Sequence, residues 1–232
     1  MRGAVLIALL AAPVAAQDVY PLPEGCRAYV TIQMRDCSVS HHFTCAGDPE
    51  GYQHRVDLDE EGLSYSGTID AEAQWMASRH YRSMHSEVLE AAPADRSSMS
   101  ALLAEGYDSW DFVTESPEIG PTRYVGFDRL TGDEVVIDGQ RLLRTEYEIV
   151  ATMADGTEVW RGTGREYVHP DWRMFLSGQS SYVMPDDSFE TDGAPVEFIL
   201  PGEPGFLSRN PKHGCGMVMS LLSIDTTEEI SR

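Results

Sequence analysis

Lysine is almost absent from this chain, and positive charge is scarce. Among 232 residues, 38 are Asp or Glu and 17 are Lys or Arg, with Lys212 as the only lysine. Chemistry built on a lysine, such as Schiff-base formation, therefore has a single candidate. The formal charge of -21 repels phosphate backbones and anionic lipid, which argues against nucleic-acid binding and electrostatic docking to membranes.

Long apolar runs are lacking as well. The apolar stretch at 4–12 is too short to cross a bilayer, which takes about 18–20 such residues. It follows Arg2 and precedes the small residues Val14 and Ala16, the arrangement of a secretory signal peptide. We therefore predict a signal peptide over 1–16 and one β-rich domain over 17–232. After cleavage following Ala16 this domain would be periplasmic or extracellular, without an integral membrane segment.

Strong catalytic signatures are also missing. The chain has no G-x-S-x-G, H-E-x-x-H, P-loop or C-x-x-C motif, which lowers the expectation of an enzyme without excluding one. We accordingly predict no cofactor. Its hydrophobic content of 42%, including 9% aromatic residues, is enough to bury a core, so wholesale disorder is excluded.

The cysteines predict two disulfides, because an exported chain folds under oxidising conditions. They are Cys26, Cys37, Cys45 and Cys215. Apolar and polar residues alternate over 27–34 and 37–45, as in half-buried strands. A tight hairpin between these strands places Cys26 opposite Cys45 and Val30 opposite His41, within disulfide reach for the cysteines. We predict the pairs Cys26–Cys45 and Cys37–Cys215. A slipped register that joins Cys26 to Cys37 stays open, because Arg-Asp is not a favoured hairpin turn.

The rest of the chain repeats this strand pattern. Turn residues such as those at 131–133 and 155–156 separate the segments 52–58, 63–69, 122–128, 134–137, 141–153, 157–168 and 173–184, and a further short strand begins at 195. A serine cap and a closing glycine predict a helix over 97–106, whereas 71–92 fits either a helix or a strand. The fold class is therefore all-β, mainly an antiparallel meander. We expect a closed or partly open β-barrel or β-spiral with one or two short helices.

The hairpin around Asp155-Gly156 offers the best test of register. A two-residue loop makes Glu146 face Arg165, an opposite-charge pair on the exposed face. On the other face it sets Ala151 against Trp160 and Tyr147 against Gly164, so that larger side chains cover strand glycines.

Three side chains are weak candidates for catalysis. His41 and His54 fall on inward faces by alternation, where two imidazoles could bind a metal or act as a base. Glu166 shares the face of Trp160, and a carboxylate pointing into a barrel is costly unless it is paired, which Arg173 or Thr145 could achieve. The alternative is a core histidine bonded to a backbone carbonyl and a carboxylate near the rim.

A soft-ligand pattern lies near the C-terminus. His213, Cys215, Met217 and Met219 recur at every second residue, which on a strand would suit Cu(I). The simpler interpretation is a disulfide at Cys215 and methionines packed in the core, so no metal is predicted. His80 and His85 are five residues apart, which is poor spacing for one face of a helix or a strand.

The favoured function is non-catalytic: an exported protein whose interior binds an apolar or amphipathic ligand, or which supports the cell envelope. Weak candidates for the ligand-binding residues are Trp160, Phe175 and Tyr147. A first alternative is an envelope protein with a filled core that acts through its surface. A second is a hydrolytic enzyme that uses His41, His54 and a carboxylate. The partner would be a small apolar ligand or an envelope component, and nucleic acid is not expected.

Overall fold

The computed structural model describes residues 19–216, which form thirteen strands and one short helix. The first strands are β1 (Cys26–Met34), β2 (Val39–Cys45), β3 (Gln53–Asp59), β4 (Gly62–Ile69), β5 (Trp75–His80) and β6 (His85–Leu89). After helix α1 (Met99–Glu105) come β7 (Tyr107–Glu115), β8 (Thr122–Ile137), β9 (Gln140–Met153), β10 (Glu158–His169), β11 (Met174–Met184), β12 (Asp187–Asp192) and β13 (Pro195–Ile199). The predicted signal peptide, 1–16, and the candidates Met217 and Met219 lie outside the described residues.

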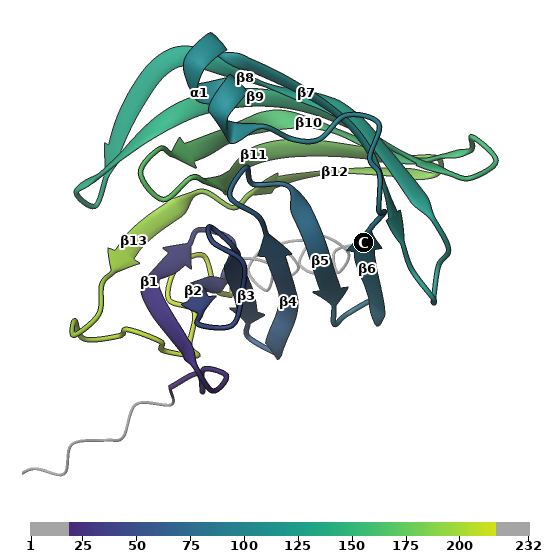
Figure 1. Ribbon diagram of the computed structural model, residues 1–232. Helices are drawn as coiled ribbons and strands as arrows, with labels where there is room; N and C mark the ends of the chain where they lie inside the picture. Colours follow the sequence, from purple (N-terminus) through teal and green to yellow (C-terminus); the bar gives the residue numbers. More distant parts are fainter. Residues whose placement is uncertain (1–18, 217–232) are drawn as a thin grey trace, which may run out of the picture.

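All thirteen strands belong to one antiparallel sheet, which confirms the predicted all-β meander. Each of β1 to β12 pairs with its neighbours in sequence, and β13 returns to pair with β1. The sheet curls strongly but does not close into a barrel (Figure 1), the partly open form of the prediction. Consequently β12 and β13, although consecutive in the chain, form the two opposite edges of the sheet.

The β1–β2 hairpin carries both disulfides in the predicted pairing. Cys26 is opposite Cys45 and bonded to it, and Cys37 is bonded to Cys215. The predicted pairing of Val30 with His41 is wrong, because a register shift between Ala28 and Val30 makes Val30 face His42. The reason is the turn: a wider loop closes where the Met34 N–H donates to the Ser38 carbonyl, in place of a disfavoured two-residue Arg-Asp turn.

The structure decides between helix and strand for one further segment and contradicts a predicted turn in another. Residues 75–80 and 85–89, left open between helix and strand, are the paired strands β5 and β6, so the helical alternative is wrong. The turn predicted at 131–133 is also wrong. There β8 continues through a register shift around Gly132, whose φ is 84°, because pairing with β9 on both sides of a bulge outweighs a local turn preference.

Helix α1 begins and ends as predicted. The Ser98 hydroxyl accepts a hydrogen bond from the Ala101 N–H, and Gly106 terminates the helix in the left-handed conformation. Met99 and Leu102 are fully buried against Val168. The helix thereby covers one end of the curled sheet, beside the long strands β7 and β8 (Figure 1).

The β9–β10 hairpin has the predicted register. Glu146 faces Arg165, Tyr147 faces Gly164 and Ala151 faces Trp160. The register shifts only beside the turn, between Glu158 and Trp160. Cross-strand pairs on both faces therefore identified this hairpin correctly.

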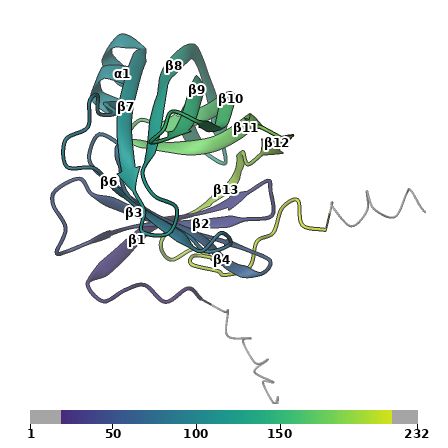
Figure 2. The ribbon, with the colours of Figure 1, turned by 90° about the vertical axis from the view of Figure 1, so that its right-hand side faces the viewer.

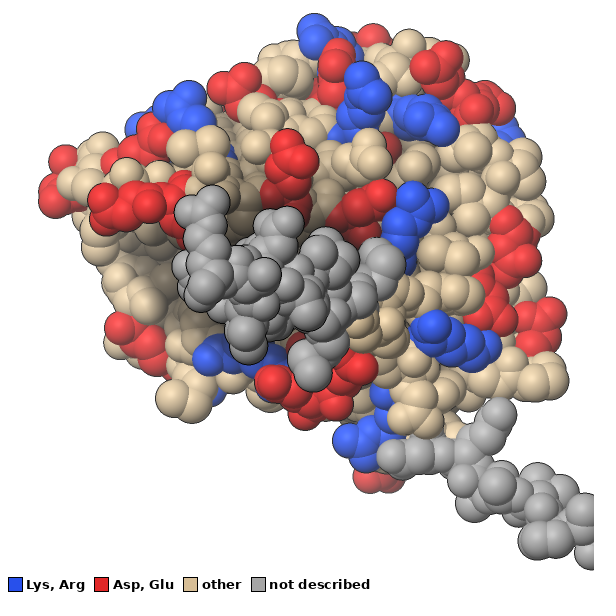
Figure 3. All heavy atoms as spheres, turned by 180° about the vertical axis from the view of Figure 1, so that it is seen from behind, with Lys and Arg blue, Asp and Glu red and all other residues tan. Residues whose placement is uncertain are grey.

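The curl of the sheet sets β1 and the shorter strands β2–β6 opposite the longer strands β7–β11 (Figure 2). Three buried clusters stabilise the curl. The cluster around Ile32 packs β1 against β9, β11 and β13, the cluster around Val39 joins β1, β2 and β3, and the cluster around Leu102 packs α1 against β10. Acidic and basic side chains are interspersed over the back of the molecule (Figure 3), and pairs such as Arg129 with Glu146, at 2.6 Å, link neighbouring strands. Among the described residues no helix has the length and apolarity that a membrane crossing requires.

A cavity between an aromatic and a polar wall

A cavity of about 510 Å³ lies inside the curl, between the short and the long strands. This volume falls in the range of sites for drug-sized ligands, roughly 300–1,000 Å³. One wall comes from β2–β6 and the other from β7–β11. The site is therefore a product of the whole meander, because no two adjacent strands enclose it.

The wall formed by the long strands is aromatic. Its rings are those of Trp110, Phe112, Tyr124, Tyr147, Trp160, Phe175 and Tyr182. From Trp110 through Phe112, Tyr124 and Trp160 to Tyr182, the centroids of successive rings are 5.6 to 6.0 Å apart. Rings at this spacing pack edge-to-face or tilted, so they form one continuous apolar band.

Glycines in the long strands leave room for these rings. A Cβ at Gly126 would collide with the Trp110 indole and with the Glu148 carbonyl. A Cβ at Gly162 would come within 3.0 Å of the Tyr182 ring and 3.1 Å of Ile149. The glycines that interrupt the strand pattern therefore let the band lie flat on the sheet.

The opposite wall is polar and charged. The Arg55 guanidinium lies 3.1 Å from the Asp57 carboxylate and 4.8 Å from the centroid of the Tyr65 ring. Asp57 also accepts a hydrogen bond of 2.5 Å from Ser40. This arrangement fixes the guanidinium at the cavity surface.

Two buried side-chain nitrogens on this wall lack a hydrogen-bond partner within residues 19–216. They are Arg55 Nε and His42 Nε2, and both residues line the cavity. Burial, together with the nearby Arg55 charge, holds the pKa of His42 well below its usual range, so the ring is neutral. Both nitrogens have almost no exposed surface, so a molecule in the cavity does not reach them as they stand. The rest of the Arg55 side chain, which is 35% exposed, offers N–H donors to the cavity.

Two carboxyl groups on the aromatic side have raised pKa values. Burial raises the pKa of Glu166 to about 8, with the Asp128 charge adding to the effect and Arg55 opposing it. Burial raises the pKa of Asp128 to about 6, against a hydrogen bond of 3.0 Å from the Trp110 indole. At neutral pH Glu166 is thus mainly a protonated, neutral donor.

The three predicted ligand-binding residues, Trp160, Phe175 and Tyr147, all line the cavity. Glu166 lines it too and stands opposite Thr145 in the ladder, but the Thr145 hydroxyl has no hydrogen-bond partner among residues 19–216 and so does not bond Glu166. The suggested partner Arg173 instead donates to the Ala71 carbonyl and to Glu72.

The candidate histidines are separated from one another. His54 lines the cavity, and its Nε2 is 2.6 Å from Asp48 and its Nδ1 is 3.0 Å from Thr68. His41 is fully buried away from the cavity, 2.9 Å from the Thr31 hydroxyl and stacked on Tyr20.

Burial lowers the pKa of His41 to about 4, which suits a neutral core histidine. His213 lies outside the cavity, with its Nε2 3.6 Å from Glu197.

Sequence reasoning missed the polar wall. Arg55 and His42 occupy the strand positions that alternation assigns to the solvent-facing side. The curl of the sheet encloses that side, and this depends on pairing across the whole meander. The available signal was the number of strands: a meander of about ten strands must curl, and its concave face then becomes an interior. Comparisons with protein-family models, with curated proteins and with solved structures find no match for this chain.

Proposed function

We propose that the protein is an exported binding protein that encloses a neutral, amphipathic small molecule in this cavity. The observation that carries the proposal is the pairing of a continuous aromatic band with a facing guanidinium at Arg55, whose side chain is 35% exposed and whose five N–H donors exceed what Asp57 alone accepts. The flat apolar part of the ligand packs on the band, and a carbonyl, hydroxyl or similar acceptor meets the donors.

Charge supports a neutral ligand. Asp57 already compensates Arg55, and the cavity also holds Glu87 and Asp128. Among these, the Glu87 carboxylate accepts hydrogen bonds from Thr114, at 2.6 Å, and from Tyr124, at 2.8 Å. A fully anionic ligand would meet repulsion from these carboxylates.

Export is supported by the apolar run at 4–12 and by the two disulfides, which persist in oxidising compartments. The size of the cavity argues against the alternative of an envelope protein with a filled core. The placement of His41 outside the cavity argues against the hydrolytic alternative.

Two fluorescent probes test the proposal. Prodan carries a naphthalene with a carbonyl acceptor at one end, whereas phenylnaphthylamine has comparable rings and no carbonyl. We expect both to bind the full chain with its disulfides intact. Replacement of Trp160 with Leu should weaken both, by about tenfold for a lost ring contact worth up to roughly 1.4 kcal/mol.

A second variant tests the contribution of the polar wall separately from that of the aromatic wall. Arg55→Met with Asp57→Asn removes the guanidinium without leaving an unpaired carboxylate. It should weaken Prodan about tenfold or more, because a hydrogen bond to a charged group contributes about 1.5–3 kcal/mol, and should leave phenylnaphthylamine unchanged. Trp172→Leu is the matched control, since Trp172 stacks on His169 and does not line the cavity. Equal binding of both probes to all variants would refute the proposal.

A further inference from the structure

The hairpin formed by β5 and β6 brings two histidines together at the cavity wall. His80 and His85 are direct cross-strand partners, and their rings stack with centroids 4.4 Å apart. A spacing of five residues disfavours a shared face within one helix or strand. In a hairpin with a four-residue loop, however, residues five apart face each other across the two strands. Glu87, two residues further along β6, is buried beside both rings.

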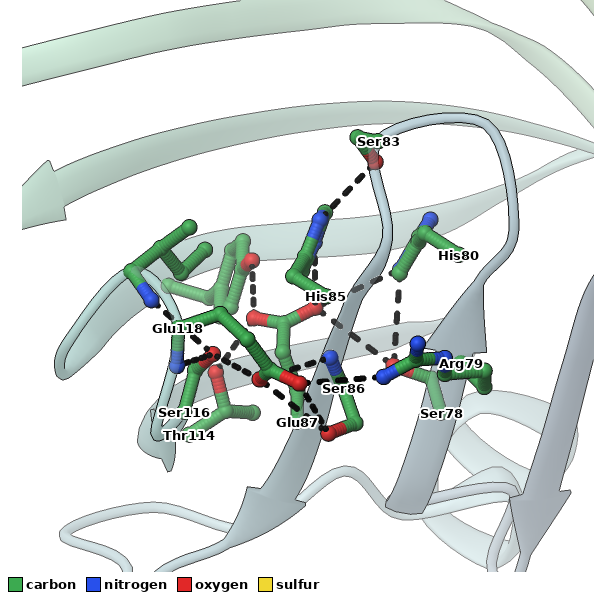
Figure 4. A network of polar contacts seen from close by, with 12 residues as sticks. Ser78, Arg79, His80, Ser83, His85, Ser86, Glu87, Thr114, Ser116 and Glu118 are labelled. Atoms are coloured by element: carbon green, nitrogen blue, oxygen red, sulfur yellow. Dashed lines mark hydrogen bonds and ion pairs between the residues drawn. The ribbon is translucent and has the colours of Figure 1, made fainter.

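Both imidazoles point the same nitrogen at one carboxylate oxygen. His80 Nε2 lies 3.3 Å and His85 Nε2 lies 3.8 Å from Glu87 Oε2 (Figure 4). The three potential ligand atoms all lie within 4.8 Å of one another. Two imidazoles and one carboxylate form a donor set that suits divalent transition metals, zinc among them.

The surrounding contacts orient this group. Ser83 Oγ lies 2.8 Å from His85 Nδ1, so an Nδ1–H that donates to this hydroxyl leaves Nε2 with its lone pair free. The other oxygen of Glu87 accepts hydrogen bonds from Thr114, at 2.6 Å, and from Tyr124, at 2.8 Å. Outer-shell bonds of this kind fix the ring orientation and carboxylate position in metal sites.

We propose that His80, His85 and Glu87 bind one divalent transition-metal ion at the wall of the cavity, with zinc as the probe. Metal–ligand distances of about 2.0–2.2 Å require the two stacked rings to tilt toward Glu87. The exposed loop between them, 81–84, allows that movement. His80 and Glu87 line the cavity, so the ion would face a bound molecule. The inference does not rest on the proposed ligand.

Zinc titration of the full chain, after treatment with EDTA, tests the site by calorimetry. We expect one zinc ion per chain and no competition from excess Mg²⁺, which prefers oxygen ligands. Cobalt should give visible absorption bands typical of imidazole coordination. The variants His80→Ala, His85→Ala and Glu87→Gln should each lose both signals.

Two further variants keep the test decisive. His213→Ala removes a histidine that also lies near a carboxylate but has no second imidazole beside it, and it should bind zinc like the wild type. Ser83→Ala alters an exposed side chain and leaves all three ligands in place. Loss of its contact with His85 should weaken zinc by about tenfold or more.

Two results of the zinc titration would contradict the proposed metal site. Absence of zinc binding, or zinc binding that persists unchanged in the His80 and His85 variants, would overturn the inference. Thermal unfolding in EDTA identifies any variant that has failed to fold, and Ser83→Ala then serves as the deciding variant. If the wild type binds zinc but does not bind Prodan, the proposed ligand is contradicted and the metal site is not.

Discussion

Replacement of Glu166 with glutamine should remove a large part of the pH dependence of stability. The pKa of this carboxyl is about 8 in the folded protein, against 4.5 as its ordinary value. Between these two values the unfolded chain releases a proton that the folded chain retains. The free energy of unfolding therefore falls as pH rises, and the contribution that is complete below about pH 4.5 is lost by about pH 8.

The structure sets the size of the effect. A rise in pKa from 4.5 to about 8 corresponds to about 5 kcal/mol, at about 1.4 kcal/mol per unit. Because Glu166 lines a cavity that solvent enters, this figure is an upper bound. The wild type should accordingly lose several kcal/mol more than Glu166→Gln on going from about pH 5 to about pH 9.

Urea unfolding at the two pH values, with disulfides intact, measures the difference. At about pH 5 the two proteins should be similarly stable, because glutamine resembles a protonated glutamate in shape and donor capacity. The matched control is Glu148→Gln on the neighbouring strand β9, whose side chain is exposed and which should follow the wild type. If wild type and Glu166→Gln lose stability in parallel, the carboxyl is not held protonated and the reasoning fails.

Three other substitutions have defined outcomes in the same urea assay. Removal of both Cys37 and Cys215 opens a cross-link between residues 178 apart and should cost roughly 3–5 kcal/mol; an unchanged midpoint would contradict this. Gly126→Ala drives a Cβ into backbone and an indole ring and should cost about 1–3 kcal/mol, whereas Gly47→Ala, whose Cβ meets no atom of residues 19–216 within 4 Å, should be neutral. Thr145→Val removes a buried hydroxyl that has no partner among the described residues and should stabilise by up to about 1 kcal/mol; a clear loss would show that the hydroxyl is bonded.

The sequence predicted features that depend on neighbours in the chain. The β9–β10 register follows from one turn and from residues that face each other, such as Tyr147 and Gly164. The disulfide between Cys26 and Cys45 follows from alternation in two adjacent strands. Helix α1 follows from its caps at Ser98 and Gly106. In each case the information lies within about twenty residues.

Features that depend on distant strands were missed. Two examples are the register shift that pairs Val30 with His42 instead of His41 and the continuation of β8 past Gly132. Both depend on the balance between the local preference of a turn and the pairing of whole strands. The candidate site shows the same limit. Trp160 was identified because its own hairpin determines its face, whereas Arg55 faces an interior only because strands far along the chain curl over it.

The connection between β12 and β13 has a mechanical consequence. These strands form opposite edges of the sheet, yet only Gly193 and Ala194 join them. The Gly193 N–H donates to the Gly178 carbonyl on β11, and the Arg35 N–H, beside β1, donates to the Ala194 carbonyl. The two edges of the curled sheet are thus joined covalently by a two-residue link. This link limits how far β12 and β13 can separate. Access can come from the open ends of the curled sheet, or from detachment of β12, whose side chains are almost all exposed.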